Sequence, residues 1–258
     1  YKMIKKFIKN LIRSLGYSVQ KIPKEINEIS INEILKHTLP TNPLIFDVGA
    51  NKGQSIRSFK KIFSNPKIHA FEPLKEDFEI LKQKYQGDQS VVLNNIALGD
   101  KKEKKSFNIM YKSDTSSFLN LNKNSEWLKY RSKSLKISKE DFNVRTSMVE
   151  VDTIDNYLKI KEIDKVNCLK IDTQGHEDKV LMGSINSLKN NIIDIVVAEI
   201  IFDNVYDKHL NFLDLEKYLV TNNYRMVGIN LTNNNIFRGL VFFADVVYIN
   251  NDRLKNII

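Results

Sequence analysis

The hydrophobic and polar positions of this chain change period in a way that predicts alternating strands and helices. Short apolar runs suit buried strands, whereas apolar residues recurring every three or four positions suit one face of a helix. The predicted strands lie within 44–53 and at 67–71, 91–98, 166–171, 192–200, 224–231 and 240–249. The predicted helices lie at 54–63, 74–85, 176–188 and 213–222. This alternation predicts an α/β domain with a mostly parallel sheet that ends in an antiparallel hairpin.

The first 43 residues precede this alternation of strands and helices. Their pattern predicts an N-terminal amphipathic helical extension to a domain at 44–258. Basic and apolar residues interleave at helical spacing over 1–17. Such a helix can lie on an anionic membrane surface, or pack on the body of the protein or on a second subunit of a homodimer. Ser30 is the expected cap of a second short helix, and Pro40 and Pro43 mark a linker into the domain.

The alternation of strands and helices is interrupted a second time, at about 100–147. This segment is polar and predicts a long irregular stretch with one short strand at 106–111. Long irregular segments inside a domain are usually binding loops, lids or disordered. Its apolar anchors, Phe118, Trp127, Tyr130 and Phe142, favour a lid on the substrate side.

Composition narrows the classes of function. The net charge of +9 favours an anionic partner, which could be a membrane surface, a nucleic acid or an acidic substrate. Cys168 is the only cysteine and lies in an apolar run, so we expect a core residue, no disulfide and a cytoplasmic protein. The longest apolar run, 192–202, contains Asp194 and Glu199 and is too short to span a bilayer. No signal peptide is evident at the start.

The stretch LIFDVGANKG at 44–53 predicts a buried strand, a glycine turn and the start of a helix. Glycines let backbone N–H groups approach a ligand closely. The spacing is not G-x-G-x-x-G, which disfavours a nicotinamide dinucleotide. The carboxylate of Asp47, before the turn, suits a cation such as the amino group or sulfonium of S-adenosylmethionine. The alternative is an ordinary strand-to-helix turn.

Two further strand ends predict contacts with a nucleoside. Glu72 ends the second strand about 20 positions after Gly53, where nucleotide-binding α/β folds hold ribose hydroxyls. The alternative is a solvated glutamate. Asn95 and Ile96, at the end of the third strand, are placed to meet an adenine by a hydrogen bond and by packing.

The stretch VNCLKIDTQGHEDKVLMG at 166–183 predicts a second functional turn. The candidates for acid–base chemistry are Asp172, His176, Glu177 and Glu199, which lie near the carboxyl ends of adjacent strands. His176 has a suitable unperturbed pKa, unless it only faces solvent in the first helical turn. Glu177 could instead favour the positive end of its own helix. A magnesium site built from Asp172, Glu199 and Asp152 is a weaker alternative, so we expect no metal.

As an ordered set, these motifs resemble the FkbM family of S-adenosylmethionine-dependent methyltransferases. The set is DVGANKG, AFEP, NNIALGD, VDTIDNYL, CLKIDTQGHEDKVLMGS and VVAEI. The resemblance implies a Rossmann-like class I methyltransferase fold, with a central seven-stranded sheet and helices on both faces. It also implies methylation of a hydroxyl on a sugar, polyketide or related natural product.

The resemblance also implies roles for individual residues. The methionine part of the cofactor would contact Asp47, Gly49, Ala50, Asn51, Gly53 and Asp172. Glu72 would hold the ribose, and the adenine would face Asn95, Ile96 and Ala97. Ser116 and Ser117 match a hydroxyl patch, and Asp172 and Glu177 match the D-x-x-G-x-E core. His176 occupies a variable position, so its role is not inherited.

We therefore expect an O-methyltransferase that acts on a small molecule, sugar or glycan precursor in the cytoplasm or at the inner face of the membrane. An RNA 2′-O-methyltransferase is the alternative that the charge favours, although no N-P-P-[YF] motif follows the fourth strand. A non-catalytic membrane-docking protein that retains the fold is a third alternative. The intact DVGANKG turn and Glu72 disfavour it.

Overall fold

The computed structural model describes residues 30–208, 211–231 and 241–255. The amphipathic helix predicted at 1–17 lies outside these ranges, so its membrane and subunit contacts stay predictions. Residues 232–240, which connect the last two strands, also lie outside these ranges. Within the described ranges, no helix combines the length and the apolar character needed to cross a bilayer.

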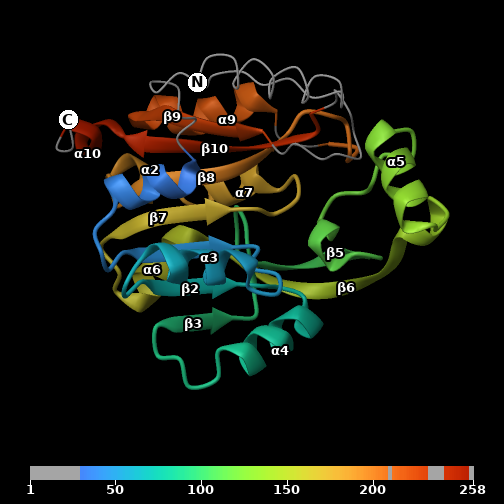
Figure 1. The fold of residues 1–258 in the computed structure, drawn as a ribbon, viewed down its shortest axis with the longest axis horizontal. Helices are drawn as coiled ribbons and strands as arrows, with labels where there is room; N and C mark the ends of the chain where they lie inside the picture. The colour runs from blue at the N-terminus through green and yellow to red at the C-terminus, as the bar shows by residue number, and fades with distance from the viewer. Residues whose placement is uncertain (1–29, 209–210, 232–240, 256–258) are drawn as a thin grey trace, which may run out of the picture.

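A seven-stranded sheet forms the centre of the fold (Figure 1). Its strands are β1 (Leu44–Val48), β2 (Lys67–Phe71), β3 (Val91–Asn94), β7 (Val166–Ile171), β8 (Ile193–Ile201), β9 (Tyr224–Leu231) and β10 (Phe243–Asn250). The order across the sheet is β3-β2-β1-β7-β8-β10-β9. Strands β3, β2, β1, β7 and β8 are parallel, whereas β10 is antiparallel to both of its neighbours. The predicted mostly parallel sheet and C-terminal antiparallel pair are therefore confirmed.

Helices cover both faces of this sheet, as predicted. Residues of α2 (Ile31–Thr38), α3 (Gln54–Ile62) and α4 (Lys75–Lys84) pack in one core. Residues of α6 (Ile154–Lys161), α7 (Glu177–Met182), α8 (Ile185–Lys189) and α9 (Phe212–Leu219) pack in the other. A short helix α10 (Asn251–Lys255) and a 3₁₀ turn at Val220–Asn222 complete this part. Cys168 is buried in the first core, as expected.

The helix α2 belongs to the core of the domain, although it precedes residue 44. Ser30 caps it in a capping box with Glu33, which satisfies two backbone N–H groups at the helix start. Leu35 and Leu39 are buried, and Ile34 lies so close to Gly228 of β9 that a Cβ there would meet it at 2.4 Å. Residues 31–39 therefore pack as part of the domain.

The single helix predicted over 176–188 is wrong, because the chain breaks it into α7 and α8 at Gly183. A Cβ at Gly183 would lie 1.9 Å from the backbone oxygen of Gly99. The carbonyl of Gly183 accepts the backbone N–H of Asp155, and the N–H of Ser187 donates to the Asp155 carboxylate, so these two groups do not form the helical bond between them.

The strand predicted at 91–98 is confirmed only over 91–94, since the chain leaves the main sheet at Asn95 and Ile96. The following β4 (Ala97–Leu98) pairs with β6 (Asn143–Asp152), which also pairs with β5 (Glu103–Met110). The segment predicted to be irregular thus contributes a second, three-stranded sheet. Figure 1 shows β5 and β6 beyond the carboxyl ends of β1, β2 and β3.

The rest of this insertion carries helix α5 (Glu126–Leu135) and 3₁₀ turns at Ser113–Thr115 and Glu140–Phe142. Of the predicted anchors, Trp127 and Phe142 are buried in a cluster with Met110 and Tyr206, whereas Tyr130 is exposed. This cluster fixes the insertion beside the end of the main sheet, where it forms one wall of a pocket.

Candidate functional site

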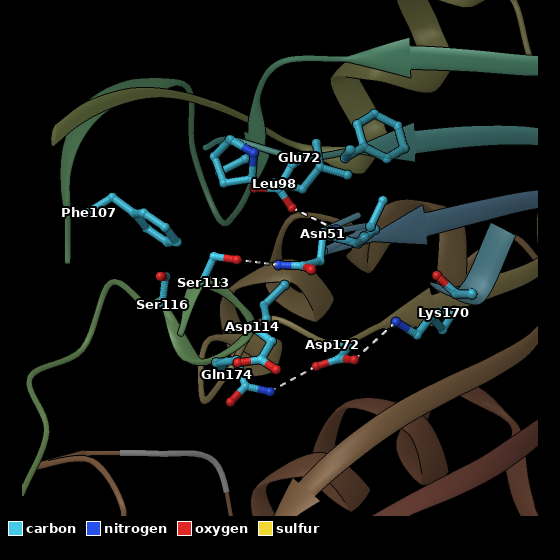
Figure 2. A pocket seen from close by; sticks show the side chains of 18 of the residues that line it. Asn51, Glu72, Leu98, Phe107, Ser113, Asp114, Ser116, Lys170, Asp172 and Gln174 are labelled. Atoms are coloured by element: carbon cyan, nitrogen blue, oxygen red, sulfur yellow. Dashed lines mark hydrogen bonds and ion pairs between the residues drawn. The ribbon is translucent and has the colours of Figure 1, made fainter. Parts of the chain in front are cut away.

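A pocket lies at the carboxyl ends of β1, β2 and β7 (Figure 2). Parallel α/β sheets bind ligands in this crevice, at the point between β1 and β7 where the strand order reverses. The opposite wall comes from β5 and from residues 113–118 of the insertion. The pocket therefore lies between the two sheets.

The glycine turn after β1 forms the floor of the pocket. The backbone N–H groups of Gly49 and Ala50 donate to the carbonyl oxygen of Phe71, at 3.0 and 3.1 Å. Gly49 has a φ of 83°, and a Cβ there would lie 1.9 Å from the backbone oxygen of Asp172. Only glycine fits that close approach of two strand ends. Gly49, Ala50 and Asn51 line the pocket, and their contact with a cofactor stays a prediction.

Gly53, in contrast, is not among the residues that line the pocket. It is the N-cap of α3 with a φ of 84°. A Cβ there would meet Leu81 and Tyr85 of the α4 region at 3.0 Å. Gly53 thus serves helix packing, and the cofactor contact that the resemblance implies stays a prediction.

Glu72 lines the pocket at the end of β2. Its two carboxylate oxygens accept the backbone N–H groups of Asn51 and Leu74, each at 2.8 Å. Burial raises the pKa of Glu72 to about 7. Because each carboxylate oxygen has two lone pairs, each can still accept one hydroxyl from a ligand.

Asn51 joins the glycine turn to the opposite wall. Its side-chain amide donates to Asp77 at 3.0 Å and to the hydroxyl of Ser113 at 3.3 Å. Ser116 also lines the pocket, and its hydroxyl accepts the backbone N–H of Met110. Ser117 is buried behind this wall, where its hydroxyl donates to the carbonyl of Gln174.

One end of the pocket is apolar. Leu98, Phe107 and Phe118 line it, and the two phenylalanine rings pack edge to face with centroids 4.9 Å apart. Sequence reasoning missed Leu98 and Phe107, since their placement depends on the second sheet. Of the three residues predicted to face an adenine, only Ala97 lines the pocket.

The other two predicted adenine contacts point elsewhere. The side-chain amide of Asn95 donates to the carbonyl oxygens of Glu72 and Pro73, at 2.8 and 3.1 Å, so it fixes the turn that ends β2. Ile96 packs against the core under the sheet. Neither is among the pocket's lining residues.

The other end of the pocket is charged. Asp47 and Lys170 are direct neighbours in the parallel register of β1 and β7. The Lys170 ammonium lies 3.1 Å from an oxygen of Asp172 and 3.5 Å from Oδ1 of Asp47. Lys170 and Asp172 line the pocket, whereas Asp47 is fully buried beneath it and also accepts the hydroxyl of Ser55.

The opposite charges of Asp47 and Lys170 each counteract the effect of burial on the pKa of the other. Burial raises the pKa of Asp47, and the positive charge of Lys170 opposes that rise. Burial disfavours a charged Lys170, but the carboxylates of Asp172 and Asp47 outweigh it and raise the pKa of the lysine. Sequence reasoning missed Lys170. The available signal was a lysine within an otherwise apolar strand.

Gln174 links Asp172 to a buried carboxylate behind the pocket. Its side-chain amide donates to Asp172 at 3.0 Å and to Glu199 at 2.7 Å. Burial and the nearby carboxylates of Asp172 and Glu177 raise the pKa of Glu199 well above its usual value. Glu199 is not a lining residue, so it supports Gln174 from behind.

His176 and Glu177 also lie outside the lining of the pocket. Glu177 accepts the backbone N–H groups of Thr173 and Gly175, at 2.8 and 3.3 Å, and so holds the turn before α7. His176 is only 3% exposed and packs on Phe118. Burial, with a smaller effect of Lys105, lowers the pKa of His176 to about 3. Of the four predicted acid–base candidates, only Asp172 faces the cavity.

The three carboxylates of the alternative magnesium site, Asp172, Glu199 and Asp152, do not form a cluster. Asp152 accepts the side-chain amide of Asn156 and the backbone N–H of Thr153 at the start of α6. Within the described ranges, no group of three or more His, Cys, Asp or Glu residues could hold a metal ion.

The burial of Glu177 predicts a dependence of stability on pH. Its pKa is raised from 4.5 to about 7 by burial, so the stability it contributes is complete below pH 4.5 and is lost as pH rises through 7. This shift corresponds to at most roughly 3 kcal/mol. From about pH 5 to about pH 8, we expect the free energy of unfolding of Glu177→Gln to fall less than that of the wild type. Urea denaturation measures both.

A neutral glutamine oxygen can accept the same bonds from Thr173 and Gly175, so the variant should be about as stable as the wild type at acidic pH. Glu140→Gln, on an exposed 3₁₀ turn, is the control for loss of one negative charge. Equal slopes for Glu177→Gln and the wild type would contradict the expectation.

The fold and the pocket together define a Rossmann-like α/β protein of the methyltransferase type. The structure resembles the crystal structure of methyltransferase FkbM from Methylobacillus flagellatus KT, with a TM-score of 0.51 and 14% identity. That likeness covers 81% of this chain and 44% of the other, so this chain spans less than half of that protein. The chain belongs to the methyltransferase FkbM domain family, whose model matches residues 47–226.

Two other similar structures are more distant. One is an rRNA methylase from Streptococcus thermophilus, with a TM-score of 0.46, 8% identity, and coverage of 88% of this chain and 99% of that one. The other is fibrillarin from Aeropyrum pernix with natively bound S-adenosyl-L-methionine, with a TM-score of 0.45, 10% identity, and coverage of 84% and 73%. Likeness at this level does not bear on substrate. No curated protein matches the chain.

Proposed function

We propose that this protein is an S-adenosylmethionine-dependent O-methyltransferase that methylates a hydroxyl of a sugar, a glycan precursor or a related natural product. The observation that carries the proposal is Glu72. Its carboxylate lines the pocket beside the glycine turn, and two backbone N–H groups fix its orientation. A fixed carboxylate of this kind suits the vicinal hydroxyls of a ribose.

The chain's own residues fit the three parts of this cofactor in order along the pocket. The apolar end, with Leu98 and Phe107, suits a purine ring. Glu72 suits the ribose, and the charged end suits an amino acid. Asp47 lies buried beneath this end and forms an ion pair with the Lys170 ammonium at 3.5 Å, so the end carries charges of both signs.

When bound, the cofactor supplies a methyl group on a sulfonium, which leaves as a neutral thioether. The protein aligns an acceptor oxygen with that methyl and excludes water, and held geometry of this kind contributes up to ~7–11 kcal/mol. Asp114 lines the pocket from the 3₁₀ turn of the insertion. Its carboxylate can take the proton of the acceptor hydroxyl, which typically accelerates such a reaction by ~10²–10⁴-fold.

The family resemblance of the motifs supports a hydroxyl acceptor on a sugar or natural product. The net charge of +9 supports an anionic acceptor such as a nucleotide sugar, or a peripheral site on the inner membrane face. The charge alone also fits an RNA, so RNA belongs among the acceptors to be compared.

Calorimetric titration with S-adenosylmethionine and, separately, with NADH tests the cofactor. We expect micromolar binding of the first and none of the second. The acceptor is then sought by transfer of a labelled methyl group to nucleotide sugars, glycans and a short RNA. Binding of neither cofactor would refute the proposal, and labelling of the RNA alone would replace the sugar acceptor by a 2′-hydroxyl.

A further inference from the structure

Lys170 places a positive charge at the inner end of the pocket. Among the described residues that line the pocket, it is the only basic one. Its ammonium lies 3.1 Å from Asp172 and 3.5 Å from Asp47, and its side chain is 16% exposed. An ammonium has three N–H donors, and these two carboxylates use at most two of them. One donor therefore remains for a ligand in the cavity.

Three backbone N–H groups of the turn beside Lys170 are already paired, which leaves the N–H groups of Gln54 and Ser55 at the start of α3 as the competing donors on the pocket wall. The N–H groups of Gly49 and Ala50 donate to the carbonyl of Phe71, and that of Asn51 donates to Glu72. Two of these N–H groups are thus hydrogen-bonded to the end of β2, and the third is hydrogen-bonded to the Glu72 carboxylate. Among the described residues that line the pocket, Lys170 therefore offers the positive charge to an anionic group at this end.

An α-amino acid presents two opposite charges to such a site. Its ammonium needs a carboxylate, which Asp172 offers on the pocket wall. Its carboxylate needs a donor that is not already used. Figure 2 shows Lys170 and Asp172 side by side at one end of the pocket, with Phe107 at the other. A paired lysine and aspartate is therefore complementary to a zwitterion.

We propose that Lys170 binds the α-carboxylate of the methionine part of the cofactor while Asp172 binds its α-ammonium. This inference rests on the proposed function, because it takes S-adenosylmethionine as the ligand. Lys170 then selects cofactors that carry an intact amino acid. Asp47 holds the lysine in place from below, through the register of β1 and β7.

The experiment compares three probes on the full chain by calorimetry: S-adenosylmethionine, decarboxylated S-adenosylmethionine and methylthioadenosine. The second lacks only the carboxylate, and the third lacks the amino acid altogether. We expect the wild type to bind S-adenosylmethionine about tenfold or more tightly than the decarboxylated form, as for a charge-assisted hydrogen bond in a partly buried site.

Lys170→Met keeps the length of the side chain and removes the charge. We expect the preference for the carboxylated form to disappear, while methylthioadenosine binds as in the wild type. That third probe also shows that the variant is folded. Lys170→Arg should retain most of the preference. Lys189→Met removes an exposed positive charge at the end of α8, outside the lining of the pocket, and should leave the preference unchanged.

The outcomes separate this inference from the proposed function. If the wild type binds none of the probes, the proposed function fails. If it binds S-adenosylmethionine and the decarboxylated form equally, the carboxylate is not recognised and the inference is wrong. If Lys170→Met keeps the preference, other donors, such as backbone N–H groups at the start of α3, bind the carboxylate and Lys170 does not.

Discussion

Gly49→Ala is expected to remove cofactor binding and to lower the free energy of unfolding by about 3 kcal/mol or more. The alanine Cβ would lie 1.9 Å from the backbone oxygen of Asp172, and neither backbone can yield without separating β1 from β7. The φ of 83° adds a further cost of about 1–2 kcal/mol for any L-residue. Both effects displace the glycine turn and the Asp172 carboxylate together.

Gly87→Ala is the matched control for this prediction. Gly87 has a φ of 78°, but a Cβ there would meet nothing within 4 Å. It therefore reports the backbone strain alone, at about 1 kcal/mol. Urea denaturation and titration with S-adenosylmethionine give the two readouts. The explanation fails if Gly49→Ala is no more destabilising than Gly87→Ala, or if it leaves binding within about threefold of the wild type.

The strand ends that follow a clear apolar run could be located from sequence. Asp172 and Glu72 follow buried strands directly, and parallel strands end at the same edge of a sheet. The structure brings both to the pocket, together with Gly49. Local pattern was sufficient here because the β-strand period and the glycine turn are both local properties.

The third strand end could not be located in the same way. The segment from Val91 to Leu98 is apolar on both sides of two asparagines, and the chain divides it there between two sheets. The side chain of Asn95 is held by two carbonyls of the β2 turn, which is a contact between distant parts of the chain. The consecutive asparagines at 94 and 95 were the available local signal of a turn.

Lys170 and His176 show a second limit of local pattern. The proximity of Lys170 to Asp47 follows from the register of β1 on β7, which depends on packing along the whole strands. His176 was a candidate base because of its ordinary pKa. Phe118 and the insertion bury it, which lowers that pKa to about 3. A neutral imidazole with so low a pKa is a weak proton acceptor near pH 7.

Glu72→Ala is expected to weaken binding of S-adenosylmethionine by more than about tenfold, because two charge-assisted hydrogen bonds to the ribose are lost. Alanine also leaves the backbone N–H groups of Asn51 and Leu74 without their acceptor. Unpaired buried donors destabilise the turn by about 1–3 kcal/mol each. The denaturation midpoint is therefore measured beside the affinity, at a temperature at which the variant is folded.

A ligand that lacks one hydroxyl separates the ribose contact from damage to the turn. Methylthioadenosine and its 2′-deoxy analogue are titrated into the wild type and into Glu72→Ala. We expect the wild type to discriminate between them by about tenfold and the variant to discriminate little. Equal discrimination in both proteins would mean that another group holds the ribose, even if Glu72→Ala binds both ligands weakly.

The pKa of Glu72 adds a third readout. It lies at about 7 without ligand, because burial disfavours the carboxylate. Ribose hydroxyls donate to the ionised form, so binding should lower this pKa and release a proton. Affinity of the wild type should therefore rise with pH between about 6 and 8, and Glu72→Ala should show a smaller rise. Calorimetry in buffers of different ionisation enthalpy measures that proton directly, and an equal release from the variant would assign it to another carboxylate such as Glu177 or Glu199.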